Sequence, residues 1–182
     1  LPPPPPIPTT FIVAYFFTPA MMSYYEIMLK IPKTLKGIFS LTDNVIVPIS
    51  SEINIAAKEK ISNLFVRGMR IKFILLVPII LFFLFNIQFI LNLWISAEFT
   101  FLAPYICLLL LWNLFTPFAN YGWLILVGMN KNMNQFMVYS FFSNFLKILF
   151  LTLFIDQINL FAVPLSYLTF LLMIPYSLYI QK

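Results

Sequence analysis

Lysine residues within or beside long apolar stretches are the side chains of this sequence best placed to do chemistry. Lys30, Lys33 and Lys36 recur at every third position, which puts them near one face of a helix. This spacing favours a cationic surface that attracts an anionic headgroup such as a phosphate. A second interpretation is that the lysines reach water from a helix end, with Glu26 and Lys30 as an ordinary surface pair.

The polar character continues along residues 31–53. The apolar positions of this segment recur at spacings of three, four or seven, and a second stripe is polar and includes Asp43 and Asn44. This pattern is typical of an amphipathic helix. Such a helix either lies on a membrane surface or spans the membrane with one wet face. Asp43 is a candidate to titrate, to hold a cation or to pair with a lysine.

A second candidate polar site lies in the segment FFSNFLKILF, residues 141–150. Lys147 is in the middle of this apolar run, and Asn144 is three residues before it on the same helix face. A lysine at that depth needs water or a polar partner. Two interpretations are open, namely a polar site inside a helix bundle and hydrogen bonding between neighbouring helices.

Several other kinds of chemistry lack the residues they need. Histidine is absent, which removes most zinc sites and histidine-assisted nucleophilic catalysis. A single cysteine, Cys107, excludes an internal disulfide, and four glycines are too few for a glycine-rich phosphate loop. The basic residues between positions 58 and 72 come with no base-reading motif. We therefore expect no enzymatic activity, no metal or other cofactor, and no nucleic-acid partner.

The composition predicts that these residues are carried by membrane helices. The chain has 182 residues, of which 62% are hydrophobic and 9% are charged, whereas soluble domains have about 25% charged residues. Backbone polar groups in lipid must pair internally, which leaves helices or a closed barrel. The apolar stretches are continuous and do not alternate as barrel strands do. The expected fold class is therefore all-α, a polytopic bundle of transmembrane helices.

About six helices are expected, since crossing a membrane takes about 20 mostly apolar residues. The predicted ranges are 11–29 with a kink at Pro19, 31–53, 72–93, 101–127, 135–155 and 160–180. Together, residues 11–182 form one transmembrane lobe, and 54–70 is a polar connection. Residues 1–10 are a proline-rich lead-in that does not begin with methionine, which indicates a truncated start.

Basic residues in the connections predict the orientation of the bundle. With six spans, one side carries seven of them (Lys58, Lys60, Arg67, Arg70, Lys72, Lys131 and Lys182). The other side carries three (Lys30, Lys33 and Lys36). Because cytoplasmic loops are enriched in lysine and arginine, the first side and the C-terminus are expected in the cytoplasm.

Four segments with characteristic motifs follow one another along the chain. They are YYEIMLKIPKTLKGIFSLTDNVIVPISSEI with its Pro-x-x-Ser element at Pro48–Ser51, the basic KEKISNLFVRGMRI, the segment LWISAEF, and LVGMNKNMNQ with a Gly-x-x-Lys turn. In this order they resemble the C-terminal half of polysaccharide-exporter flippases, the O-antigen-type members of the MOP superfamily that also contains the MATE drug exporters. The resemblance covers about residues 11–180.

This resemblance implies a MATE/MOP-like lobe of a two-lobed flippase in the bacterial cytoplasmic membrane. Such a protein translocates undecaprenyl-diphosphate-linked oligosaccharide repeat units for O-antigen or capsule. Its lobes rock about a central cavity, in which Lys30, Lys33 and Lys36 would face the diphosphate. Expected partners are the lipid-linked oligosaccharide, the bilayer, the polysaccharide assembly machinery and a coupling ion, either proton or sodium. Only one of the two lobes lies in this chain.

Three other functions stay open. A MATE-like cation-coupled multidrug antiporter would favour acidic residues in its cavity, where lysines dominate here. A membrane-embedded polysaccharide polymerase or glycosyltransferase would favour a large extracytoplasmic loop or an aspartate-rich cytoplasmic motif, and the sequence has neither. A non-transport interaction subunit is compatible with a chain of half the family's length.

Overall fold

The described part of the chain is entirely helical. The computed structural model describes residues 9–40, 48–49, 51, 58–128, 133–167 and 169, and every element in those residues is an α-helix or a short 3₁₀ helix. This confirms the predicted all-α class. Three of the described segments are long and apolar enough to cross a membrane, namely Ser62–Trp94, Ala97–Pro117 and Ser140–Ser166. The larger count of six crossings stays a prediction.

The N-terminal region contains two helices where the sequence predicted one. Helix α1 (Thr9–Phe16) ends just before a break at Phe17 and Thr18, and α2 (Pro19–Ser40) follows. The backbone N–H of Met21 donates to Thr18 Oγ1 at 3.4 Å. Thr18 therefore acts as an N-cap, and Pro19 occupies the first helical turn, where its missing N–H costs nothing. The predicted kink at Pro19 is thus a helix boundary.

Helix α2 also crosses the predicted boundary near residue 30. It contains Pro32 and runs without interruption to Ser40, so the start of the predicted amphipathic helix belongs to it. Its buried residues include Met28, Leu35 and Phe39, while Lys30, Lys33 and Lys36 are exposed. One face of α2 is therefore apolar and packed, and the other is basic. Residues 41–47 lie outside the described residues, so the remainder of that predicted helix is not placed.

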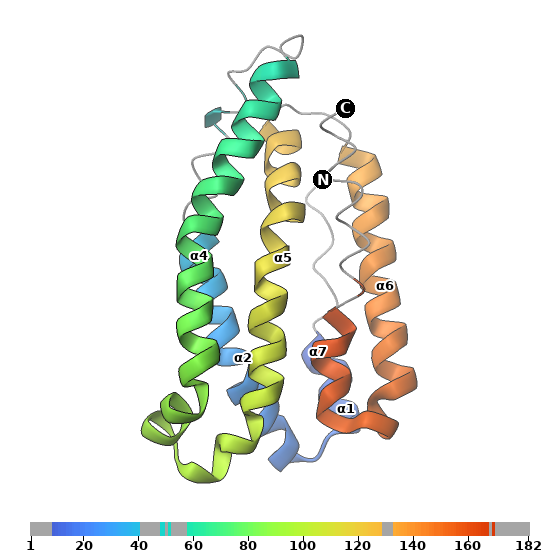
Figure 1. Cartoon of the computed structure of the whole chain (residues 1–182). Helices are drawn as coiled ribbons and strands as arrows, with labels where there is room; N and C mark the ends of the chain where they lie inside the picture. The colour runs from blue at the N-terminus through green and yellow to red at the C-terminus, as the bar shows by residue number, and fades with distance from the viewer. Residues whose placement is uncertain are drawn as a thin grey trace.

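Helix α4 (Lys58–Trp94) is the longest element, with 37 residues. It begins earlier than predicted, so the expected polar connection at 54–70 is helical from Lys58 onward. A turn at Ile95 and a 3₁₀ helix, η2 (Ala97–Leu102), lead into α5 (Ala103–Gly128). The two long helices are therefore antiparallel and lie side by side (Figure 1).

The last described elements are α6 (Met133–Ile158), η3 (Asn159–Phe161) and α7 (Ala162–Ser166). The chain turns back at Asn159, whose φ of 48° is in the left-handed region that asparagine tolerates better than most residues. The tight turn predicted at 156–159 is therefore confined to its last residue. Of the predicted helix 160–180, the part after Thr169 lies outside the described residues.

One apolar core joins these elements. Tyr25 of α2, Ile106 of α5 and Leu151 of α6 are each buried within it. Helices α2, α4 and α5 form one side of the bundle, and α6 packs with α7 and α1 on the other (Figure 1). A second, small cluster of Phe65, Met69 and Ile125 packs the N-terminal part of α4 against α5.

The exposed face of α4 shows how the bundle fits a membrane. Large apolar side chains line it from Ile71 to Leu93, and Phe85 is 84% exposed. Over that stretch the helix is about 33 Å long, close to the thickness of a hydrocarbon core, about 30 Å. Exposed Arg67 and Arg70 lie just beyond one end of the stripe, and Trp94 lies at the other. The stripe is therefore long enough for α4 to cross a membrane.

Candidate functional site

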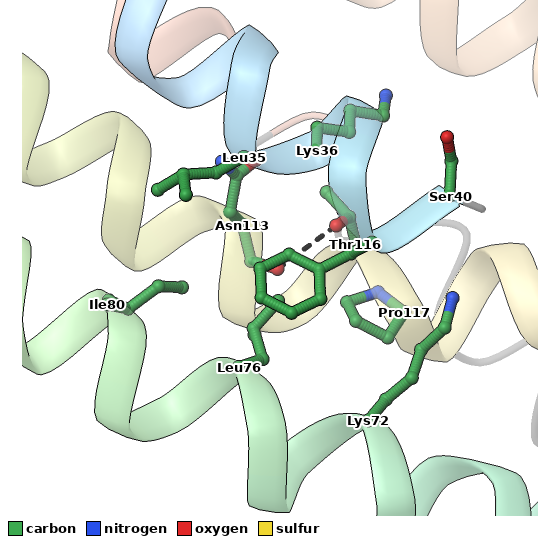
Figure 2. A pocket seen from close by; sticks show the side chains of 10 residues that line it. Leu35, Lys36, Ser40, Lys72, Leu76, Ile80, Asn113, Thr116 and Pro117 are labelled. Carbon is green, nitrogen blue, oxygen red and sulfur yellow. Dashed lines mark hydrogen bonds between the residues drawn. The ribbon is translucent and has the colours of Figure 1, made fainter. Parts of the chain in front are cut away.

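A pocket lies between α2, α4 and α5 and carries most of the polar groups inside this side of the bundle. It has about 390 Å³ of empty space, part of it open to solvent. Its lining residues come from all three helices: Leu35, Lys36, Phe39, Ser40, Lys72, Leu76, Ile80, Asn113, Thr116 and Pro117 (Figure 2). The cavity volume comparable with other sites is about 30 Å³, room for roughly two water molecules.

Two lysines from different helices line this pocket. Lys72 of α4 is only 4% exposed although it lies two residues from exposed Arg70. Its side chain rises beside Pro117, whereas the amine of Lys36 on α2 points away from Lys72 (Figure 2). The count of basic residues had put Lys36 and Lys72 on opposite sides of the membrane. The structure brings them to one pocket because α2 extends past the predicted boundary and ends beside the first part of α4.

The polar groups of α5 explain how this pocket is built. Pro117 has no N–H, so the carbonyl of Asn113 one turn earlier loses its helical donor. The hydroxyl of Thr116 donates to that carbonyl at 3.0 Å in its place. The Asn113 side chain donates to the carbonyl of Pro32 in α2 at 3.1 Å, and this bond is buried. Asn113 therefore ties α2 to α5 at the pocket, as expected of a polar residue between membrane helices.

Lys147 of α6 is not part of the pocket lining and lies against an aromatic ring. Its Nζ is 3.7 Å from the centre of the Tyr167 ring, and the Tyr167 ring in turn lies 6.5 Å from that of Trp112. Lys36 and Lys147 are close enough for their positive charges to repel each other. We call Lys36, Lys72 and Lys147 the lysine cluster; Lys72 is buried, Lys147 is half-buried, and Lys36 is exposed while lining the pocket.

The other predicted lysines have different surroundings. Lys30 places its Nζ 5.6 Å from the centre of the Trp94 ring, at the far end of α4. Lys33 lies 3.8 Å from Glu26, and both side chains are more than half exposed. The predicted surface pair of Glu26 with Lys30 is thus a pair with Lys33. Of the lysines of α2, only Lys36 lines the pocket.

Three predicted site residues remain. Asn144 is on the exposed surface, and the other two lie outside the described residues. Asn144 is exposed and donates to the Ser140 carbonyl of its own helix at 2.9 Å, so it does not join Lys147. Its neighbour Ser143 is buried and donates to the Thr169 carbonyl at 3.3 Å. Asp43 and Asn44 lie outside the described residues.

Lys72 and Thr116 were missed as site residues by sequence reasoning. Lys72 was counted as a loop charge because it adjoins the basic segment before it. A signal was nevertheless present, since Lys72, Leu76 and Ile80 follow at spacings of four, and the two apolar residues are buried. That spacing puts Lys72 on the packed face of α4. Thr116 drew no attention because its role depends on the proline that follows it.

Comparisons provide no further assignment. No model of a protein family, no curated protein and no solved structure matches this chain. Within the described residues, no group of three histidine, cysteine, aspartate or glutamate side chains is placed to hold a metal ion. The site is therefore characterised by its lysines, its amide and hydroxyl groups and its apolar lining.

Proposed function

We propose that this protein is a membrane transporter that translocates undecaprenyl-diphosphate-linked oligosaccharides across the bacterial cytoplasmic membrane. The observation that carries the proposal is the lysine cluster: Lys72 and Lys147 are in helices long and apolar enough to cross a membrane, and Lys36 of α2 lines the pocket with Lys72. Charges at membrane depth are costly, and they occur there mainly along substrate or ion pathways. An anionic substrate would offset that cost each time it binds.

The depths of the three lysines suit the movement of an anion through part of the bilayer. Lys72 lies next to the membrane boundary marked by Arg70 and Ile71. Lys147 is about 13 Å along α6 from Asp156, which puts it well inside the hydrocarbon layer. Lys36 lines the pocket with Lys72 and is within electrostatic range of Lys147. A diphosphate could therefore be passed from one cation to the next.

The three parts of the proposed substrate would occupy different surroundings. The diphosphate would bind at the lysines that line the pocket. The polyprenyl chain would stay in the lipid, against exposed apolar side chains such as those of α4. The oligosaccharide would need the wider cavity that a second lobe completes. A cationic drug, the substrate of the antiporter alternative, would be repelled by the same lysine cluster.

A reconstituted system tests this proposal. The protein that carries this chain is placed in liposomes with a fluorescent undecaprenyl-diphosphate oligosaccharide, and an impermeant quencher reports movement between leaflets. We expect Lys36→Gln and Lys147→Gln to slow translocation by about tenfold or more, since a hydrogen bond to a charged group contributes about 1.5–3 kcal/mol. Lys36→Arg, which keeps the charge, should retain most of the rate.

Lys33→Gln is the matched control, because it removes the same charge from a side chain that is 57% exposed and paired with Glu26. It should transport like the unmodified protein. Equal rates for Lys36→Gln, Lys147→Gln and Lys33→Gln at equal protein levels would contradict the proposal. Equal movement of an uncharged polyprenyl glycolipid would contradict it too, because the lysine cluster would then have no role in recognition.

A further inference from the structure

Helix α4 is too long to lie wholly within a membrane. Its 37 residues extend about 55 Å at the helical rise, whereas the hydrocarbon core is about 30 Å thick. Apart from Val66, its exposed large apolar side chains begin at Ile71. The preceding turns, from Lys58, therefore extend about 20 Å beyond the hydrocarbon, into the layer of lipid headgroups and the water above it.

Two arginines lie where α4 leaves the hydrocarbon. Arg67 and Arg70 are both exposed and are three residues apart, so they share the outward face of the helix. Directly below them on that face are Ile71 and Ile74, which are 59% and 66% exposed. A pair of guanidinium groups thus lies one helical turn above an apolar surface of isoleucines. On the opposite face of the same turns, Lys72 is buried in the pocket.

We infer that Arg67 and Arg70 form a binding site for the phosphate headgroup of an anionic phospholipid, whose acyl chains lie along Ile71 and Ile74. A guanidinium group binds phosphate oxygens through two parallel hydrogen bonds. Basic residues just outside a membrane helix attract anionic lipids through the surface charge of the bilayer. The isoleucines below fit a lipid rather than free phosphate, because only a lipid has chains to cover them.

Lipid binding at this site would also fix the depth of the pocket in the membrane. Arg70 and Lys72 are two residues apart on opposite sides of α4. A headgroup held by the arginines on the outer face therefore fixes the height of Lys72 on the inner face. The inference does not depend on which substrate the lysine cluster recognises, so it stands or falls separately from the proposed function.

Binding of phosphatidylglycerol and phosphatidylcholine with identical acyl chains tests the inference. The protein that carries this chain is purified in a neutral detergent, and retained lipid is measured by native mass spectrometry. We expect a preference for phosphatidylglycerol that weakens as salt is raised. Arg67→Gln and Arg70→Gln should each reduce that preference about fivefold, the factor for one basic residue near an anionic surface.

Lys33→Gln again serves as a control for charge loss at an exposed position, and it should leave the preference unchanged. Equal retention of both lipids by the unmodified protein would overturn the inference. So would an unchanged preference in the double variant of Arg67 and Arg70. Full competition by inorganic phosphate would also overturn it, because the site would then bind free phosphate and not a lipid. A preference in the unmodified protein that disappears at high salt would support it even where a variant fails to fold.

Discussion

At the scale of single residues, the most informative side chain is Lys147. A lysine in the middle of a membrane helix costs roughly 3 kcal/mol on insertion scales. Here its ammonium group lies against the face of Tyr167, 3.7 Å from the ring centre. An aromatic face attracts a cation by about 2 kcal/mol when both are shielded from water. The ring therefore offsets much of the cost while leaving the charge available to an anion.

We predict that Tyr167→Leu destabilises the protein by about 1–2 kcal/mol, because it removes the ring from beneath Lys147. Tyr167→Phe should cost much less, since the ring stays. Thermal unfolding in detergent measures both changes. The difference between the leucine and phenylalanine variants should shrink when Lys147 is replaced by methionine. If that difference is unchanged, the ring acts through packing against Trp112 alone.

At the scale of helices, a proline removes a backbone hydrogen bond, and a nearby side chain can supply the missing donor. Pro117 removes one backbone hydrogen bond from α5, and the hydroxyl of Thr116 restores a donor to the Asn113 carbonyl. The same turn of α5 holds α2 through the bond from Asn113 to Pro32. The pocket therefore lies at a place where α5 has fewer backbone bonds than an uninterrupted helix, held by two side-chain bonds.

A double-mutant cycle tests this account of α5. Thr116→Val should cost about 1–2 kcal/mol, because it leaves the buried carbonyl of Asn113 without a donor. In a Pro117→Ala background the alanine N–H can serve that carbonyl, so the same threonine change should cost much less. Unfolding of the two single variants and the double variant gives the coupling energy. Additive effects would show that Thr116 does not replace the bond lost at Pro117.

At the scale of the whole molecule, the ends of the helices define two membrane faces. Because α4 and α5 are antiparallel, the end of α4, the 3₁₀ helix η2 and the start of α5 share one face. Trp94 with Lys30 against its ring lies there, as interfacial tryptophans commonly do. Arg67 and Arg70 lie at the opposite face. The orientation of these faces is predicted by the basic residues of the connections.

Cysteine labelling measures that orientation. In a Cys107→Ser background, Glu98→Cys and Asn63→Cys introduce single thiols at exposed positions near opposite ends of α4. We predict that an impermeant maleimide labels position 98 in spheroplasts and labels position 63 only after the membrane is opened. The reverse pattern would invert the orientation. Labelling of both positions from one side would show that α4 does not cross the membrane.

The sequence by itself determined the all-α class and the presence of helices long and apolar enough to cross a membrane. Lipid offers no partners for backbone groups, so long apolar stretches must form helices, and composition alone reveals such stretches. The sequence also identified Lys36 and Lys147 as residues in need of polar surroundings. It did so because the cost of a charge among apolar neighbours can be judged from the chain alone.

The tertiary structure decided which of those residues meet. Helical periodicity specifies which residues share a face of one helix. It does not specify which neighbouring helix packs against that face. Lys30, Lys33 and Lys36 therefore recur at equal spacing on one helix but have different surroundings. Lys30 lies against the Trp94 ring, Lys33 pairs with Glu26, and Lys36 lines the pocket. Lys72 becomes an interior residue for the same reason. Its burial depends on α2 and α5, which are far from it in the sequence and adjacent to it only in the folded bundle.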